Sequence, residues 1–144
     1  MRSCQLVDEL AHGDFDAVDF TVYRAVSYSE FARFKASIGQ PEQAIALYAK
    51  ARPLLQAVVA ENPTEFFRRD SLSRLCLDYA RLARQSGRLS NALDACEEAV
   101  LLAQGLLDAQ PNDHARRRFL ATCTAERDRL RAQLPETIVT IGAR

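Results

Sequence analysis

Two short stretches of the sequence share one pattern: IGQPEQAIAL at residues 38–47 and SGRLSNALDA at residues 86–95. Each stretch has Gly in its second position and Ala in its seventh, followed by an aliphatic residue. When residues 32–72 are aligned with residues 80–120, a shift of 48, eleven of the forty-one positions are identical without a gap. Self-similarity at one fixed spacing is the signature of a repeat architecture. The sequence therefore predicts one structural unit that is used twice.

Apolar residues recur three and four positions apart inside each period, for example at Ala44, Tyr48 and Ala51. This spacing places them on one face of an α-helix. We therefore predict an all-α fold with helices at residues 16–38, 41–61, 64–86, 89–109 and 112–134. The linkers are short, so neighbouring helices are expected to be antiparallel and to form a helix-hairpin solenoid.

Turn residues mark the same boundaries. Gly39 and Gly87 are expected to end helices in the left-handed conformation that suits a residue without a Cβ. Pro41 can open a helix, where its missing N–H costs nothing. Thr64 and Asn112 occupy equivalent places and are predicted to be N-caps.

The small-residue pattern resembles that of the tetratricopeptide repeat (TPR) family. The first copy fills the family's positions with Ala32, Gly39, Ala44, Tyr48, Ala51 and Pro63, and the second with Ala80, Gly87, Ala92, Cys96, Ala99 and Pro111. The period exceeds the family's usual length of about 34 residues because each helix has gained about two turns. It is similar to long variants found in bacterial multidomain proteins beside kinase or protease domains. A HEAT-like repeat and a plain helical bundle are the structural alternatives.

This resemblance covers residues 14–134. Residues 1–13 are expected to be the end of a preceding repeat helix or an N-terminal cap, because Leu6 aligns with Leu54 and Leu102. Residues 135–144 are expected to be a C-terminal tail. Pro53 inside the second helix predicts either a kink near residues 49–53 or a break of the helix there.

The third copy stops early, because Pro135 stands where the first two copies have their turn glycine. The last helix therefore lacks a partner helix. We expect one flank to be open at four of its residues: Leu120, Cys123, Leu130 and Leu134. Either the tail residues Ile138, Val139 and Ile141 fold back over this flank, or another chain or domain covers it. An apolar flank left exposed would be a binding surface, through which the chain could also associate with itself.

The 144 residues carry no net charge, which disfavours bulk attraction to nucleic acid or an anionic membrane. The sequence has no run of 18 apolar residues, and its N-terminus lacks the apolar segment of a signal peptide. The cysteines form no C-x-x-C pair and are interpreted as buried reduced thiols, with a disulfide or a distant-ligand metal site as alternatives. These features predict a cytoplasmic protein without a cofactor.

The sequence lacks the common motifs of catalysis. The sequence has no Gly-rich phosphate loop, no H-E-x-x-H and no G-x-S-x-G. We therefore expect a protein that is not an enzyme.

The resemblance implies a protein–protein interaction scaffold that binds a peptide or protein along its concave face. Positions carried over from the family place Val26 on this face, and the residues expected to bind the partner are Arg33, Arg74, Leu77, Arg81, Arg84 and Arg129. Arg33, Arg81 and Arg129 recur at the 48-residue spacing and would suit an acidic peptide. The alternative for this ladder is a set of salt bridges within the chain.

Two other functions stay open at this point. The chain could be a structural or regulatory segment of a larger multidomain protein, with no ligand of its own. It could also bind nucleic acid through its Arg-rich last helix, although the balanced charge and the lack of interleaved aromatic residues there disfavour this.

Overall fold

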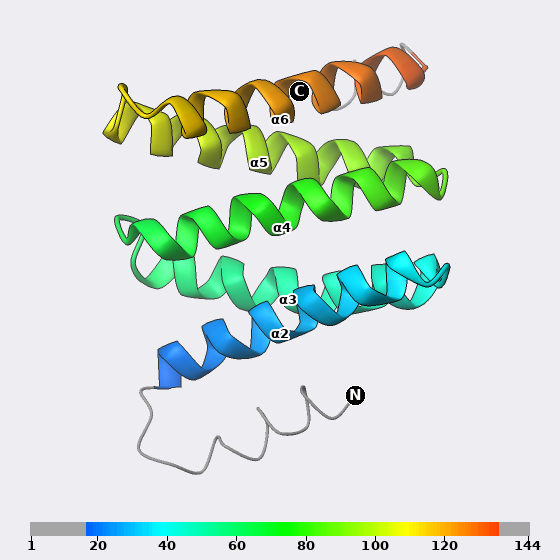
Figure 1. Cartoon of the computed structure of the whole chain (residues 1–144), viewed down its shortest axis with the longest axis horizontal. Helices are drawn as coiled ribbons and strands as arrows, with labels where there is room; N and C mark the ends of the chain where they lie inside the picture. Colours follow the sequence, from blue (N-terminus) through cyan, green and yellow to red (C-terminus); the bar gives the residue numbers. More distant parts are fainter. Residues whose placement is uncertain (1–16, 136–144) are drawn as a thin grey trace. The chain divides into compact units, whose positions relative to one another are not determined.

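The structure is a computed structural model that describes residues 17–135, and this range contains five α-helices and no strand. The helices are α2 (Ala17–Ser37), α3 (Pro41–Glu61), α4 (Phe66–Gln85), α5 (Leu89–Ala109) and α6 (His114–Gln133), which Figure 1 traces from blue to orange. The predicted all-α class is confirmed, and every helix end lies within two residues of its predicted position. The expected N-terminal segment 1–13 and the tail beyond Pro135 lie outside the described residues.

The helix boundaries keep the spacing found in the sequence. α3 begins at Pro41 and α5 at Leu89, which are 48 residues apart. α4 begins at Phe66 and α6 at His114, again 48 residues apart. Segments with equivalent sequence positions therefore adopt the same secondary structure.

The two turn glycines end α2 and α4 as predicted. Gly39 has φ 76° and Gly87 has φ 77°, both in the left-handed region. In each turn the residue after Gly donates its N–H to the carbonyl five residues earlier, at 2.9 Å from Gln40 and 2.8 Å from Arg88. This bond, with a second one from the glycine N–H, is the Schellman arrangement that satisfies the last carbonyls of a helix.

The N-caps lie one residue later than predicted, so the assignment to Thr64 and Asn112 is wrong. Glu65 accepts hydrogen bonds from the backbone N–H groups two and three residues ahead, at 3.3 and 3.0 Å. Asp113 does the same at 3.0 and 3.2 Å. A carboxylate is a stronger acceptor than a hydroxyl or amide beside the positive end of the helix dipole. It therefore sets the first turn, and both helices begin two residues later than expected.

α3 runs without interruption through Pro53. Of the two outcomes expected there, a break of the helix is therefore excluded. Pro53 lies on the exposed side of the helix, whereas Ala51, Leu55 and Val58 are buried. Burial of these side chains stabilises the helical backbone on both sides of the one hydrogen bond that proline cannot donate.

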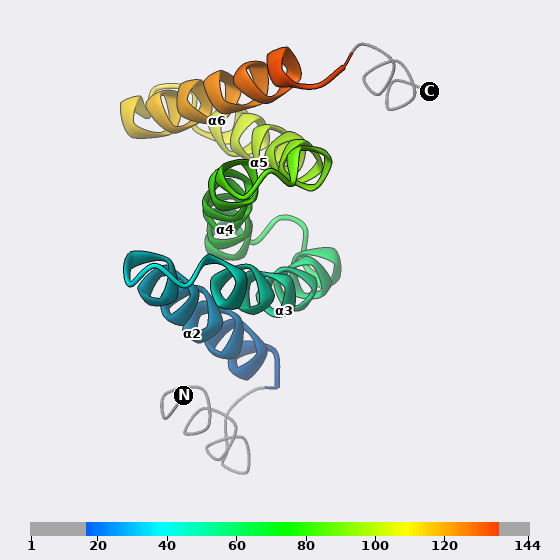
Figure 2. The ribbon, with the colours of Figure 1, turned by 90° about the vertical axis from the view of Figure 1, so that its right-hand side faces the viewer.

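The contacts of the chain divide it into two compact units, Met1–Leu75 and Cys76–Arg144, with the boundary inside α4. In the first unit α2 packs beside α3 (Figure 2), and Ala25, Ala32, Ala44 and Ala51 are completely buried. These small side chains allow the two helix axes to approach closely. Ala32, Ala44 and Ala51 occupy small-residue positions of the repeat pattern.

In the second unit α5 packs beside α6 (Figure 2). The expected open flank of α6 is wrong for three of its four residues, because Cys123 and Leu130 are completely buried and Leu134 is 8% exposed. The reason is that two helices reach this side of α6. Arg84 of α4 bonds to Glu126, and the Cys96 thiol of α5 donates to the Cys123 carbonyl at 3.3 Å. Only Leu120 is half-buried.

Candidate functional site

The arginines expected to bind a partner in the first unit have carboxylate partners on their own helix. Arg33 pairs with Glu30 at 3.1 Å, and the two side chains are 56% and 62% exposed. Arg74 pairs with Asp70 at 2.9 Å. Exposed pairs three or four residues apart on one helix contribute only about 0.3–0.5 kcal/mol. These guanidinium groups are therefore paired already, but weakly.

Two expected binding residues of the second unit share one buried carboxylate. Glu126 is 5% exposed, and its two oxygens contact Arg84 Nε at 2.5 Å and Arg129 Nη1 at 3.4 Å. Removing a carboxylate from water is costly unless an opposite charge lies close to it. Arg84 and Arg129 therefore neutralise Glu126. For Arg129, a ladder residue, this is the salt bridge within the chain that was the alternative to binding an acidic peptide.

Leu77 and Arg81 differ from the other expected site residues. Leu77 is 4% exposed and belongs to the core, so its assignment to a partner-binding surface is corrected. Arg81 is exposed and makes no ion pair with the part of the chain that the structure describes. Of the six expected residues, Arg81 alone offers an exposed guanidinium without a carboxylate partner among residues 17–135.

An acidic ladder accompanies the basic one along the sequence. Glu30, Asp78 and Glu126 also recur at the 48-residue spacing, each three residues before a ladder arginine. Opposite charges three residues apart face each other on a helix. This spacing was visible in the sequence and would have predicted the ion pairs made by Glu30 and Glu126.

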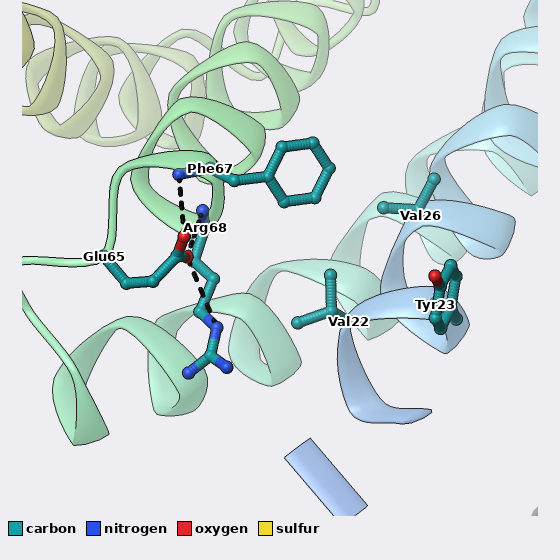
Figure 3. Close-up of a pocket in the computed structure, with 6 residues that line it drawn as sticks. All are labelled: Val22, Tyr23, Val26, Glu65, Phe67 and Arg68. Atoms are coloured by element: carbon teal, nitrogen blue, oxygen red, sulfur yellow. Dashed lines mark hydrogen bonds and ion pairs between the residues drawn. The ribbon is translucent and has the colours of Figure 1, made fainter. Parts of the chain in front are cut away.

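A pocket of about 360 Å³ lies in the first unit (Figure 3). It is lined by Val22, Tyr23 and Val26 of α2 and by Glu65, Phe67 and Arg68 at the start of α4. Val22 is 7% exposed, whereas Tyr23 is 62% and Phe67 60% exposed. In Figure 3 the Phe67 ring extends from α4 towards the valines of α2. The pocket therefore combines an apolar floor with two accessible aromatic rings.

The N-cap residue of α4, Glu65, lines one side of this pocket. Glu65 accepts the Phe67 N–H at 3.3 Å and also pairs with Arg68 Nε at 3.4 Å. Asp113 and Arg116 form the same pair at the start of α6, at 3.0 Å. The backbone N–H of Phe67 is thus bonded to the cap residue Glu65, and the side chains of Glu65 and Arg68 are paired with each other.

Of the residues expected on the concave face, Val26 lines the pocket. The five expected arginines do not line it: Arg33, Arg74, Arg81, Arg84 and Arg129. Tyr23 and Phe67 were missed because their equivalents in the next period are Ser71 and Ala115. A search for repeated positions passes over such residues. The available signal was the opposite one, namely aromatic residues at places where the next copy is small.

Cys76, Cys96 and Cys123 are buried reduced thiols, as the sequence predicted, and Cys4 lies outside the described residues. Burial raises the pKa of the Cys96 thiol from 9.0 to about 12, with smaller contributions from Cys123 and Glu126. Cys96 therefore stays protonated near neutral pH and is a poor nucleophile. Residues 17–135 contain no group of three or more His, Cys, Asp or Glu side chains placed to hold a metal ion.

None of the helices formed by residues 17–135 combines the length and apolarity needed to cross a membrane. Compared with protein-family models, with curated proteins and with solved structures, the chain has no significant match. The resemblance to TPR proteins therefore stays a prediction, which depends on the small-residue pattern and the 48-residue spacing.

Proposed function

We propose that this chain is a non-catalytic interaction module of the TPR type, and that it binds a peptide or protein partner through the pocket of the first unit. The observation that supports this is the pocket itself, with its apolar floor and its two exposed rings, Tyr23 and Phe67. Aromatic side chains are enriched at the residues that dominate protein–protein binding energy. The volume of about 360 Å³ is at the small end of ligand pockets and suits one apolar side chain.

A peptide fits this pocket better than a polar small molecule. Sites for small polar ligands present several converging polar groups. Here the polar lining consists of the Tyr23 hydroxyl and of Glu65 and Arg68, whose side chains pair with each other. Glu65 also accepts the backbone N–H of Arg68. The affinity would therefore come from burying apolar surface of the partner against Tyr23 and Phe67.

The preference for an acidic partner now depends on a single residue. Arg81 is exposed without a carboxylate partner among residues 17–135, whereas the other arginines of the expected site pair with Glu or Asp. Arg81 belongs to the second unit, so pairing of an acidic residue with Arg81 is a proposal separate from binding at the pocket of the first unit. The buried reduced thiols of Cys76, Cys96 and Cys123 fit a reducing compartment, so we propose that the module is cytoplasmic.

Selection from a displayed library of random 12-residue peptides tests the proposal. The full chain should enrich peptides with an aromatic or aliphatic anchor. The double variant Tyr23→Ser with Phe67→Ala carries the residues found one period later, and it should lose at least tenfold in affinity for the selected peptides. Leu101→Ala is the matched control, because Leu101 is 75% exposed on α5 and lies outside the pocket.

Circular dichroism of both variants checks that the helices are retained. Failure to enrich any peptide would favour the alternative function, a structural or regulatory segment without a ligand. Selected peptides that bind the double variant and the parent chain equally well would contradict a role for the pocket.

A further inference from the structure

A second apolar surface lies on the C-terminal half of α2 and on Ile38, the residue that follows the helix. Phe34 is 53% and Ile38 48% exposed, and they lie one helical turn apart. The Phe31 ring stacks on Phe34 with ring centres 6.2 Å apart, and the Lys35 ammonium lies 5.2 Å from the centre of the Phe31 ring. We call these four residues, Phe31, Phe34, Lys35 and Ile38, the α2 docking face.

This face is distinct from the face by which α2 packs on α3. The completely buried residues Ala25 and Ala32, with Tyr28 between them, mark the contact side of α2. Phe34 and Ile38 are offset from that stripe and remain accessible. Their spacing of four residues is the one with which helices present apolar anchors to each other.

The second unit contains the same positions two periods later, on α6. Leu130 occupies the position equivalent to Phe34, and Leu134 the position equivalent to Ile38. These leucines are 0% and 8% exposed. Arg131 stands for Lys35 and pairs with Glu97 of α5 at 3.1 Å. On α6 this face is therefore the one that contacts a neighbouring helix.

We propose that the α2 docking face binds an amphipathic helix of a partner protein that has the pattern of α5. α5 contacts α6 through Cys96 and Glu97. The neighbouring residues Ala92, Ala95 and Ala99 of α5 are small and completely buried. A helix with small residues at these positions can approach Phe34 and Ile38 closely. An acidic residue in the register of Glu97 would pair with Lys35, which now donates to Gln40 Oε1 at 3.0 Å.

A second copy of the chain is the weaker choice of occupant. Its own segment with this pattern is α5, whose small residues are already buried. To dock on another copy, α5 would have to leave α6 and expose Leu130 to water. A separate helix has no such cost, so the partner protein is favoured.

The test uses the full chain and a labelled synthetic peptide with the sequence of residues 89–104, carrying Cys96→Ala to prevent oxidation. Fluorescence anisotropy should detect binding to the parent chain. Phe34→Glu should weaken this binding at least tenfold, because it places a charge in the apolar contact. Leu101→Glu in the full chain is the control and should bind the peptide like the parent.

A charge exchange makes the test specific for the proposed pairing. Lys35→Glu should weaken binding about tenfold, and a peptide that carries Glu97→Lys should restore it. The pocket variant Tyr23→Ser with Phe67→Ala should bind this peptide normally, so failure of either proposal can be recognised separately.

Three results would overturn the proposal. The first is no binding, or equal binding to the parent and to Phe34→Glu. The second is displacement of the labelled peptide by a peptide of residues 1–16, which would make the chain's own N-terminal segment the occupant. The third is self-association in sedimentation velocity that Phe34→Glu abolishes, which would make a second copy the occupant.

Discussion

The pairs Glu30–Arg33 on α2 and Glu126–Arg129 on α6 occupy the same positions of the 48-residue pattern, two periods apart. The first pair is more than half exposed on both sides, whereas Glu126 is only 5% exposed. The difference arises from another helix, because Arg84 of α4 covers Glu126 and supplies its shorter contact. The comparison teaches that the repeat pattern determines the spacing of side chains along a helix, while the neighbouring helices determine their environment.

The largest expected difference in stability is between substitutions at Leu130 on α6 and at Phe34, its equivalent on α2. Leu130→Ala should lower the free energy of unfolding by about 3 kcal/mol, because it leaves a cavity at a completely buried site. Phe34→Ala at the equivalent position should cost less than about 1 kcal/mol, because the ring is 53% exposed. Urea denaturation of both variants measures the contrast. Equal losses would mean that the two faces are buried alike in solution.

The buried ion pair comes next in size. Arg84→Ala should lower the free energy of unfolding by about 2–3 kcal/mol, somewhat less than for a fully broken buried pair, because Arg129 still contacts Glu126. Arg33→Ala, the surface counterpart, should cost less than about 0.5 kcal/mol. The double change Arg84→Met with Glu126→Leu should recover most of the loss. No recovery would indicate that Arg84 acts through packing of its side chain rather than through its charge.

The two turn glycines, unlike the residues above, should lose the same stability when they are substituted, because their turns have the same geometry. Gly39→Ala and Gly87→Ala should each cost about 1 kcal/mol, because φ near 76° strains an L residue and no other atom lies within 4 Å of the added Cβ. The measurement is again urea denaturation. A clear difference between the two variants would contradict the equivalence of the two turns.

Local features of the fold followed from the sequence because their causes lie close together along the chain. The turn at Gly39 and the start of α3 at Pro41 require only neighbouring residues and the apolar stripe that follows. The same holds for Gly87 and Leu89 one period later. The cap at Glu65 was missed because glutamate is a poor N-cap on average, and the geometry of this turn outweighs that average.

The site could not be predicted in the same way, because its causes are distant in sequence. Arg84 meets Glu126 across 42 residues, and no spacing along one helix indicates that pair. Tyr23 and Phe67 line one pocket from two helices. Leu77 was assigned to a surface from its position in the repeat, whereas the packing of the second unit buries it.

The smallest expected effect is the pH dependence of the hydrogen bonds that Asp113 accepts at the start of α6. Hydrogen bonds from the backbone N–H of Arg116 first, and then from that of Ala115, hold the pKa of the Asp113 carboxyl below its ordinary value of 3.8, although some desolvation opposes them. A lowered pKa in the folded state means that the carboxylate stabilises the start of α6 above pH 3.8, and that this contribution is lost as the pH falls through the lowered pKa. NMR titration of the Ala115 and Arg116 amides should therefore show their transition below pH 3.8.

Asp113→Asn keeps an acceptor oxygen without a charge, so its amides should lack this transition while α6 keeps its first turn. A transition at or above the ordinary value would mean that the cap is open in solution, and the cap of α6 would then differ from the cap of α4, where Glu65 accepts the N–H groups of Phe67 and Arg68.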